Sequence, residues 1–323
     1  MDELSLVTGG AGFIGSHLVE ELVRRGRPVR ILDDFSTGQW KNIDHLPSNQ
    51  VEIIEGSLTD VNAVNKAVRG AGTVFHLGAL ASVARSVETP LVTHAACVTG
   101  TLHVLDAARQ LGVRRVVYAG SSSAYGGSSS EAGQREEQLP AAKSPYAAAK
   151  LAGEYYMQAF AAAYGLETVR VRFFNIFGPR QRSDSPYSGV IAMFIKLMSG
   201  GERPVIHGDG SQSRDFTYVA NAVQAMLRAA EAPDASGNVY NVGTGSSVSV
   251  LQLVDALNEL FETNLEPIFV PSRTGDVKFS RADLRNTRRD LGYEPHVSFE
   301  DGLRETAAWY VETLDGLRTL QRV

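Results

Sequence analysis

The chain has 323 residues, 43% of them hydrophobic and 21% charged, and its formal net charge is -5. This composition fits a globular protein of one or two domains and excludes a disordered, collagen-like or coiled-coil chain. The slight acidity disfavours a nucleic-acid binder, which needs clustered cations, and one cysteine, Cys97, cannot form an internal disulfide.

Strand and helix patterns alternate through the first half of the chain. Short apolar runs typical of buried strands lie at 4–8, 28–32, 51–55, 73–77, 115–119 and 168–173. Stretches with apolar residues three or four positions apart, typical of amphipathic helices, lie at 13–25, 61–68, 91–111 and 146–164. This alternation predicts a doubly wound α/β fold, in which helices cover both faces of a parallel sheet.

The alternation stops after Asn175, where Gly, Pro and Ser residues typical of loops become frequent. Helical patterns follow at 190–198, 219–231 and 250–261. We expect this half to form a smaller lobe over the carboxyl edge of the sheet. The lobe is interleaved with the sheet, because the segment from about 216 to 241 has the pattern of a helix and strand that return to it.

The apolar runs are shorter than the roughly 18 residues that a membrane-spanning helix needs. The segment from Met1 to Thr8 has neither the basic cluster nor the small-residue cleavage site of a secretory signal. We therefore expect a soluble cytoplasmic protein that binds neither membranes nor nucleic acid.

Three glycines, Gly9, Gly12 and Gly15, lie between the first predicted strand and the first predicted helix. Glycines at this spacing allow a tight turn, let the backbone approach a pyrophosphate, and let the helix pack closely on the strand. Asp33 ends the second predicted strand, where a carboxylate can accept hydrogen bonds from a ribose 2′-hydroxyl. Together they predict a dinucleotide site that prefers NAD to NADP. The alternatives are an ordinary glycine turn and a solvated aspartate.

Tyr146 and Lys150 are four residues apart at the start of an Ala-rich helical segment, so their side chains share one helical face. A nearby ammonium lowers the pKa of a phenol, and such a tyrosine can remove a proton from an alcohol. Ser121 follows the fifth predicted strand, at the edge where doubly wound sheets bind ligands. The alternatives are a surface pair on the helix and a polar turn at the serine.

Five segments, taken in order, resemble the extended short-chain dehydrogenase/reductase family, and in particular its nucleotide-sugar epimerases. They are residues 8–17, 75–79, 144–150, 172–181 and 208–216, and the resemblance covers nearly the whole chain. It implies a Rossmann-type doubly wound sheet, with residues 1–175 and about 216–241 binding NAD. The remaining segments, about 176–215 and 242–323, would bind the nucleotide sugar.

The resemblance also implies an activity, an NAD-dependent 4-epimerase. Such an isomerase interconverts UDP-glucose with UDP-galactose, and UDP-N-acetylglucosamine with UDP-N-acetylgalactosamine, by transient oxidation at C4 and return of the hydride. No metal is expected. A homodimer is expected, joined through a four-helix interface built from residues 91–111 and 146–164 of each copy.

Residue by residue, the resemblance makes Tyr146 the catalytic base, places Lys150 on the nicotinamide ribose and lets Ser121 share the substrate proton. The implied NAD contacts also include Gly9, Gly12, Phe13, Ile14, Gly15, Asp33, Asp34, Phe35, Ser36, Thr37, Gly38, Ser57, Leu58, Leu77, Gly78, Ala79, Phe173, Asn175 and Ile176. The implied sugar-nucleotide contacts, beside Tyr146, are Ala81, Ser82, Ser122, Ser123, Asn175, Val190, His207, Arg214, Arg273, Asp276 and Ser280.

Related dehydratases have Asp-Glu directly after the catalytic Ser or Thr, where this chain has Ser122 and Ser123. Without that acid/base pair a dehydration lacks its proton donor and acceptor. Within residues 80–90 only Glu88 could substitute. A dehydratase or reductase of the same family remains the alternative function, and a non-catalytic NAD-binding regulator is a further one.

Three positions refine the expectation. Cys97 occupies a place where the family usually has Asn, and its alternative interpretation is a buried apolar residue. Ser57 occupies a place where an Asp commonly contacts the adenine. Ser280 matches a position where a small residue admits the 2-acetamido group of the sugar. Its alternative role is the N-cap of a helix over 280–283.

Overall fold

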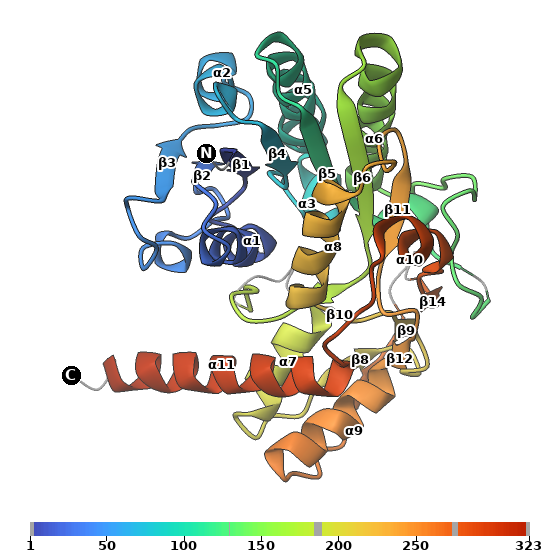
Figure 1. Ribbon diagram of the computed structural model, residues 1–323. Coiled ribbons are helices and arrows are strands. Elements are labelled where there is room, and N and C mark those ends of the chain that lie inside the picture. Colours follow the sequence, from blue (N-terminus) through green and yellow to red (C-terminus); the bar gives the residue numbers. More distant parts are fainter. Residues whose placement is uncertain (1–2, 129, 184–188, 273–276, 321–323) are drawn as a thin grey trace.

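The computed structural model describes residues 3–128, 130–183, 189–272 and 277–320, and for 314–320 it describes the backbone alone. A seven-stranded parallel sheet forms its centre, in the order β11-β6-β5-β4-β1-β2-β3 (Figure 1). In that order the strands are Val239–Val242, Glu167–Phe173, Arg115–Ser121, Thr73–His76, Ser5–Thr8, Val29–Asp33 and Val51–Glu55. The expected doubly wound fold is confirmed.

The strand order reverses between β1 and β4, which pair directly with each other. At such a point the connections after the two strands diverge to opposite sides and leave a crevice at the carboxyl edge of the sheet. The segments that follow β1 and β4 are the glycine loop and residues 77–82. The topology therefore places the predicted cofactor loop where a ligand can enter.

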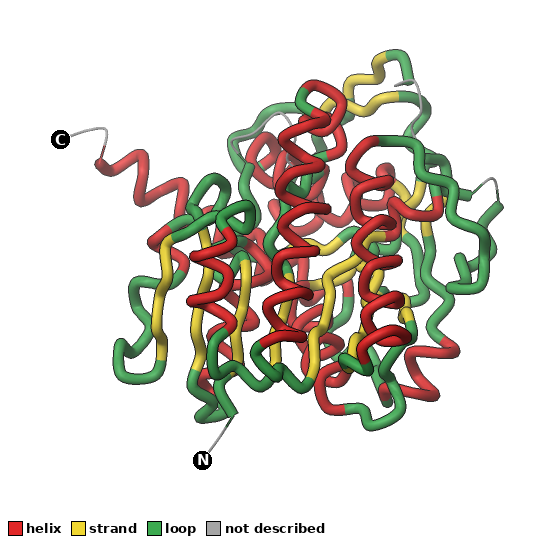
Figure 2. Tube along the Cα trace, turned by 90° about the horizontal axis from the view of Figure 1, so that it is seen from above, coloured by secondary structure: helices red, strands yellow, loops and turns green. Residues whose placement is uncertain are grey.

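Helices cover both faces of the sheet (Figure 2). One face packs against α1 (Phe13–Arg24) and α8 (Val219–Glu231), and the other packs against α2 (Val61–Val68), α5 (Gly100–Gln110) and α6 (Pro145–Tyr164). Successive strand residues point to opposite faces, so Val7 joins the first core while Leu6 joins the second. This two-sided burial explains why the strands are continuous apolar runs in the sequence.

The helix expected over 91–111 differs from the prediction. It consists of α4 (Pro90–His94), a π-helical turn (Ala95–Thr99, η2) and α5, and a short α3 (Val83–Glu88) precedes it. Gly100 lies so close to Leu58 that a Cβ on it would be 2.7 Å from the Leu58 Cβ. The extra residue of a π turn does not disturb the apolar spacing enough to be recognised in the sequence.

The second half contains most of a lobe beyond the carboxyl edge of the sheet. Its core joins α7 (Val190–Met198), α9 (Val250–Phe261) and α11 (Phe299–Leu320). Its short strands are β7 (Ile176–Phe177), β8 (Val205–His207), β9 (Ser213–Arg214), β10 (Thr217–Tyr218), β12 (Val248–Ser249), β13 (Ile268–Val270) and β14 (Phe279–Ser280). Residues 282–293, with α10 (Arg285–Leu291), instead pack into the core of the sheet. In the described residues, no helix is long and apolar enough to cross a membrane.

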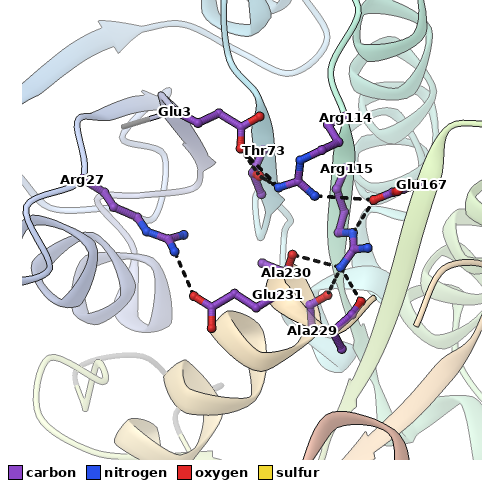
Figure 3. A network of polar contacts seen from close by, with 10 residues as sticks. Glu3, Arg27, Thr73, Arg114, Arg115, Glu167, Ala229, Ala230 and Glu231 are labelled. Carbon is purple, nitrogen blue, oxygen red and sulfur yellow. Dashed lines mark hydrogen bonds and ion pairs between the residues drawn. The ribbon is translucent and has the colours of Figure 1, made fainter. Parts of the chain in front are cut away.

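A polar network closes the opposite, amino edge of the sheet (Figure 3). Arg115, at the start of β5, is 3% exposed and donates to the carbonyls of Ala229, Ala230 and Ala232 at the end of α8. It also pairs with Glu167 at 2.8 Å, at the start of β6. The guanidinium thus satisfies carbonyl groups that a helix end leaves without partners, and it fixes α8 against β5 and β6.

Candidate active site

A cleft of about 640 Å³ runs along the carboxyl edge of the sheet. It is lined by the glycine loop after β1, the ends of β2 and β4, the start of α3, and α6. Most of the predicted cofactor residues line it. They are Gly9, Gly12, Phe13, Ile14, Gly15, Asp33, Asp34, Ser36, Thr37, Ser57, Leu58, Leu77, Gly78, Ala79, Tyr146, Lys150 and Phe173.

The glycine loop is packed too tightly for side chains. A Cβ on Gly15 would lie 2.1 Å from the carbonyl oxygen of Gly9, and a Cβ on Gly9 would lie 2.9 Å from the Cα of Gly78. Gly9 also has a φ of +70°, which side chains other than glycine rarely adopt. Gly12 precedes α1 with no side-chain cap, so the first N–H groups of the helix are available to an anion.

Asp33 has a second role that the sequence did not reveal. Its carboxylate is 7% exposed and accepts hydrogen bonds from the backbone N–H of Ala11 and of Phe35, both at 2.9 Å. Burial raises the pKa of Asp33, and these two hydrogen bonds oppose that rise. The side chain therefore holds the glycine loop against the end of β2, and it is also part of the cleft lining.

Tyr146 and Lys150 lie at the floor of the cleft. The Lys150 ammonium is 3% exposed, donates to the Ala119 carbonyl at 2.8 Å and lies 4.9 Å from the centre of the Tyr118 ring. Burial lowers the pKa of Lys150. Burial also raises the pKa of the Tyr146 phenol, and a hydrogen bond with Ser121 lowers it. Burial outweighs the hydrogen bond from Ser121, so the pKa of the phenol lies above its ordinary value, in contrast to the lowering expected from Lys150.

The hydrogen bonds around Ser121 give its hydroxyl a direction. Ser121 ends β5 and caps the short helix η3 (Ser122–Tyr125). Its Oγ accepts from the Ser123 N–H at 3.2 Å and from the Ser123 hydroxyl at 2.9 Å. Because both contacts use oxygen lone pairs of Ser121, its own O–H is directed to a further acceptor, the phenol of Tyr146.

A buried chain of hydrogen bonds joins the cofactor loop to the π turn. Thr101 donates to the Cys97 carbonyl at 2.6 Å, so His76 must donate its Nε2–H to Thr101, at 2.9 Å. The other ring nitrogen of His76 then accepts from Thr8, at 2.7 Å. Burial and the charge of Lys150 lower the pKa of His76 to about 3, so the ring is neutral. Cys97 is 1% exposed, which agrees with a buried small residue.

Several predicted residues lie outside the lining of this cleft. Ser121, Ser122 and Ser123 directly follow the lining residue Gly120 in the sequence. Two predicted substrate residues, Ala81 and Ser82, do line the cleft. The other predicted residues that the structure describes are not part of the lining: Phe35, Gly38, Asn175, Ile176, Val190, His207, Arg214 and Ser280. Arg273 and Asp276 lie outside the described residues.

The prediction that Ser280 caps a helix over 280–283 is wrong. Ser280 lies in β14, paired with Arg214 of β9, and the next helix begins at Arg285. The cause is the buried carboxylate of Asp215. It accepts from the N–H of Ala282 at 3.1 Å and from the N–H of Thr244 at 2.7 Å, and so holds residues 280–282 extended beside β9.

Sequence reasoning missed part of the lining. It includes Arg85 of α3 and the segment Arg180, Gln181 and Arg182 after β7, together with Gly189. Arg180 is ion-paired with Glu20 of α1. The sequence did contain a signal, the two arginines at positions 180 and 182. It could not show that they line the cleft, because that depends on how the loop after β7 folds back over the sheet edge. Among the described residues no cluster of metal-binding side chains occurs.

Comparison with known proteins identifies the relatives. The chain is 36% identical over 312 residues to a UDP-glucose 4-epimerase of Mycolicibacterium smegmatis, a match that covers 95% of this chain and 98% of that one. It is 34% identical over 322 residues to a UDP-N-acetyl-α-D-glucosaminuronate decarboxylase of Bacillus cytotoxicus, covering 97% and 99%. The crystal structure of Thermus thermophilus UDP-glucose 4-epimerase with NAD superimposes with a TM-score of 0.86 at 34% identity, covering 95% and 99%.

Residues 5–243 match the sequence profile of the NAD dependent epimerase/dehydratase family. The expectations of an enzyme of the epimerase class and of NAD as its cofactor are confirmed by these matches. With the glycine loop, the buried Asp33 and the Tyr146–Lys150 pair in one cleft, the chain belongs to the NAD dependent epimerase/dehydratase family.

Proposed function

We propose that the chain is a UDP-hexose 4-epimerase that interconverts UDP-glucose with UDP-galactose and also accepts the N-acetylated sugars. The observation that carries this proposal is the arrangement at the cleft floor. Tyr146 and Lys150 line it, and Ser121 approaches Tyr146 from the end of β5. This arrangement can move the one proton that an epimerisation needs. A dehydration also needs a carboxyl acid/base pair at the positions that Ser122 and Ser123 occupy here.

NAD fits the residues present. The tight glycine loop and the uncapped start of α1 suit its pyrophosphate, and Asp33 and Asp34 suit the adenosine ribose. Lys150 uses one of its three N–H groups on the Ala119 carbonyl, which leaves two for the nicotinamide ribose. When bound, NAD⁺ supplies a hydride acceptor that returns the hydride to C4 of the sugar. The division into an NAD-binding part (1–175 and about 216–241) and a substrate lobe is part of this proposal.

The protein side of the reaction is the movement of one proton. The phenol oxygen of Tyr146 takes the proton of the sugar 4-hydroxyl, and the Ser121 hydroxyl stabilises the phenolate because its O–H is directed at that oxygen. The same groups return the proton once C4 has been reduced from its other face.

The carboxylates that line the cleft argue against the dehydratase alternative. Among the described residues they are Asp33, Asp34 and Glu88. The first two lie at the end of β2, at the adenosine end expected for the cofactor, and Glu88 ends α3 and is exposed. A dehydration would need Glu88 to supply both proton donor and acceptor, whereas the epimerisation needs no carboxylate.

The direct test is a product analysis. The purified chain is incubated with UDP-glucose, UDP-N-acetylglucosamine and UDP-glucuronate in separate reactions, and the sugars are identified by NMR and chromatography. An equilibrium mixture of C4 epimers supports the proposal. A 4-keto-6-deoxy sugar identifies a dehydratase and overturns it, and so does the absence of any product with all three sugars when NAD is bound.

A second candidate function has the same chemistry on a uronic acid. Arg85 and Arg182 line the cleft in addition to the ion-paired Arg180. Guanidinium groups bind carboxylates well, and an additional anionic group on the sugar would suit them. The decarboxylase relative acts, by its name, on a uronate. Faster epimerisation of UDP-glucuronate than of UDP-glucose would favour this candidate, and release of CO₂ would indicate a decarboxylase.

Sugar selectivity is proposed to depend on Ser280. The side chain is 7% exposed, and its hydroxyl lies 3.5 Å from the amide oxygen of Gln134. We expect Ser280→Tyr to reduce kcat/KM for UDP-N-acetylglucosamine by about tenfold or more while that for UDP-glucose changes little, because the ring fills the space of the acetamido group. Steady-state kinetics on both sugars measure the ratio. An equal loss on both sugars would refute the selectivity role. The other proposed sugar-nucleotide contacts of the lobe are Asn175, Val190, His207 and Arg214.

A homodimer is proposed through the expected segments 91–111 (α4, η2 and α5) and 146–164 (α6), which pack side by side and beside α3. Exposed apolar residues gather on these helices, with Val87 64%, Leu91 82% and Tyr155 58% exposed. We expect Leu91→Asp to convert a dimer of the wild-type chain to monomer, because a carboxylate would be buried at the interface. Sedimentation equilibrium measures the mass. Leu139→Asp, at a 92% exposed residue outside these helices, is the control. A wild-type monomer would contradict the proposal.

A further inference from the structure

The catalytic helix carries a second buried charge that the reaction as described does not use. Glu154 lies one turn beyond Lys150 on α6, and the two residues are 2% and 3% exposed. Lys150 bonds to Ala119 of β5. Glu154 approaches the next residue of that strand so closely that a Cβ on Gly120 would be 2.8 Å from its Oε1. The carboxylate and the ammonium therefore lie over adjacent residues of one strand.

Arg172 of β6 neutralises this carboxylate. Its Nε and Nη2 donate to the two oxygens of Glu154 at 2.7 to 3.1 Å, and Arg172 is itself 4% exposed. In the sheet Arg172 is the partner of Gly120, so the pair lies directly over the strand that ends in Ser121. On its other side the guanidinium stacks on the ring of Tyr125, 4.7 Å from the ring centre.

A buried ion pair of this kind is weak evidence for stability, because apolar residues of similar volume often serve as well. Its position beside the catalytic lysine suggests another role. A buried ammonium loses its proton easily unless a negative charge is near. Burial lowers the pKa of Lys150, and the charges of Cys97 and, after it, of the Glu154 carboxylate oppose that lowering.

Cys97 of the π turn also faces the ammonium, and as a thiolate it raises the pKa of Lys150. The remaining groups are the neutral His76 of β4 and the phenols of Tyr118 and Tyr146, whose pKa values burial raises. Beyond Glu154, β6 contributes the cations Arg170 and Arg172, and Arg170 donates to the Glu154 carbonyl at 3.3 Å. Within the described residues, Glu154 is the carboxylate on which the charge of Lys150 depends.

We propose that Glu154 is a positioning residue that keeps the buried Lys150 ammonium protonated, and that Arg172 limits how strongly its carboxylate acts on the lysine. The proposal rests on the catalytic use of Lys150 in the function proposed above. In this proposal the Glu154–Arg172 pair sets the charge of Lys150, which lies in the same part of the cleft as the phenol of Tyr146 that must ionise.

The test replaces the carboxylate by an amide of the same shape, Glu154→Gln. The alkaline limb of the kcat–pH profile, where Lys150 loses its proton, is expected to move to lower pH by about one unit or more. The matched control is Glu167→Gln, at the opposite end of β6, where the carboxylate pairs with Arg115 (Figure 3). It removes the same charge far from Lys150 and is expected to leave the limb in place.

A second readout does not require activity. The folded pKa of Lys150 lies below that of the unfolded chain, so between the two values the unfolded chain binds more protons and stability rises with pH. The free energy of unfolding is measured as a function of pH for the NAD-free chain and for its Lys150→Met variant, and the difference between the two curves isolates this rise. In a Glu154→Gln background the rise is expected to begin at lower pH, by the same shift as the kinetic limb. This measurement decides the proposal even if the chain proves not to be an epimerase.

The double variant Glu154→Gln/Arg172→Met covers the case in which Glu154→Gln alone does not fold, because it leaves no unpaired charge. The alkaline limb of the kcat–pH profile of the double variant is expected to lie between those of the wild type and of Glu154→Gln, because both the carboxylate and its counter-charge are absent. If the Glu154–Arg172 pair had only a structural role, the variants would lose activity at every pH and the alkaline limb would stay in place. That result, or a limb of the double variant restored to the wild-type position, overturns the proposal.

Discussion

Replacement of Tyr146 by phenylalanine is expected to lower kcat by about two to four orders of magnitude, the contribution of a positioned general acid or base. The ring would remain in place at the cleft floor, but the hydroxyl that exchanges a proton with the sugar would be lost. Ser121, whose hydroxyl is directed at the phenol, would lose its acceptor. The measurement is steady-state epimerisation of UDP-glucose, with the NAD content of each preparation determined in parallel.

The loss is expected to occur without loss of the cofactor, because Tyr146 is one of many residues that line the cleft proposed to hold NAD. Tyr164→Phe is the matched control, since Tyr164 ends the same helix and is 57% exposed. It is expected to retain wild-type kcat. Activity of Tyr146→Phe within a factor of about ten of the wild type would refute the role of the phenol as base.

The second large effect is expected from Gly15→Ala. The added Cβ would lie 2.1 Å from the Gly9 carbonyl oxygen and 2.9 Å from the Gly10 Cα, both backbone atoms that cannot rotate away. The loop must open to admit it, which separates the start of α1 from β1. We expect the affinity for NAD to fall by about a hundredfold or more and the free energy of unfolding to fall by about 1–3 kcal/mol, the usual cost of overpacking.

Calorimetric titration with NAD and thermal unfolding of the NAD-free chain measure the two effects separately. Gly200→Ala is the matched control, because Gly200 lies in the turn after α7 and its nearest contact to an added Cβ is 3.3 Å. It is expected to bind NAD as the wild type does. Unchanged NAD affinity in Gly15→Ala would show that the close packing of this loop is not what forms the site.

The strands and helices of the sheet domain were predictable because their signals are local. The inner strands are buried on both faces and are therefore mostly apolar runs, as at Ser5–Thr8 and Arg115–Ser121. The short strands of the lobe escaped prediction for the opposite reason. β9 and β14 are two residues long, and their pairing depends on the Asp215 carboxylate more than on their own side chains.

The residues of the candidate site likewise fall into those that the sequence could predict and those that it could not. Gly9, Gly15, Tyr146 and Lys150 were predictable because a few residues at fixed spacing carry their chemistry. The lining by Arg85 and Arg182 was not, because it depends on how α3 and the loop after β7 lie over the sheet edge. The sequence also does not show how deeply the phenol of Tyr146 is desolvated, and this burial raises its pKa.

The doubly wound fold, the glycine loop and the shared helical face of Tyr146 and Lys150 follow from short-range periodicity and spacing, and the sequence alone predicts them. The π turn around Cys97, the extended backbone at Ser280 and the Glu154–Arg172 pair beside Lys150 are visible only in the folded chain, because they depend on contacts between residues far apart in the sequence. Desolvation and the proximity of charges, which set the pKa values at the cleft floor, exist only once the helices are packed on the sheet.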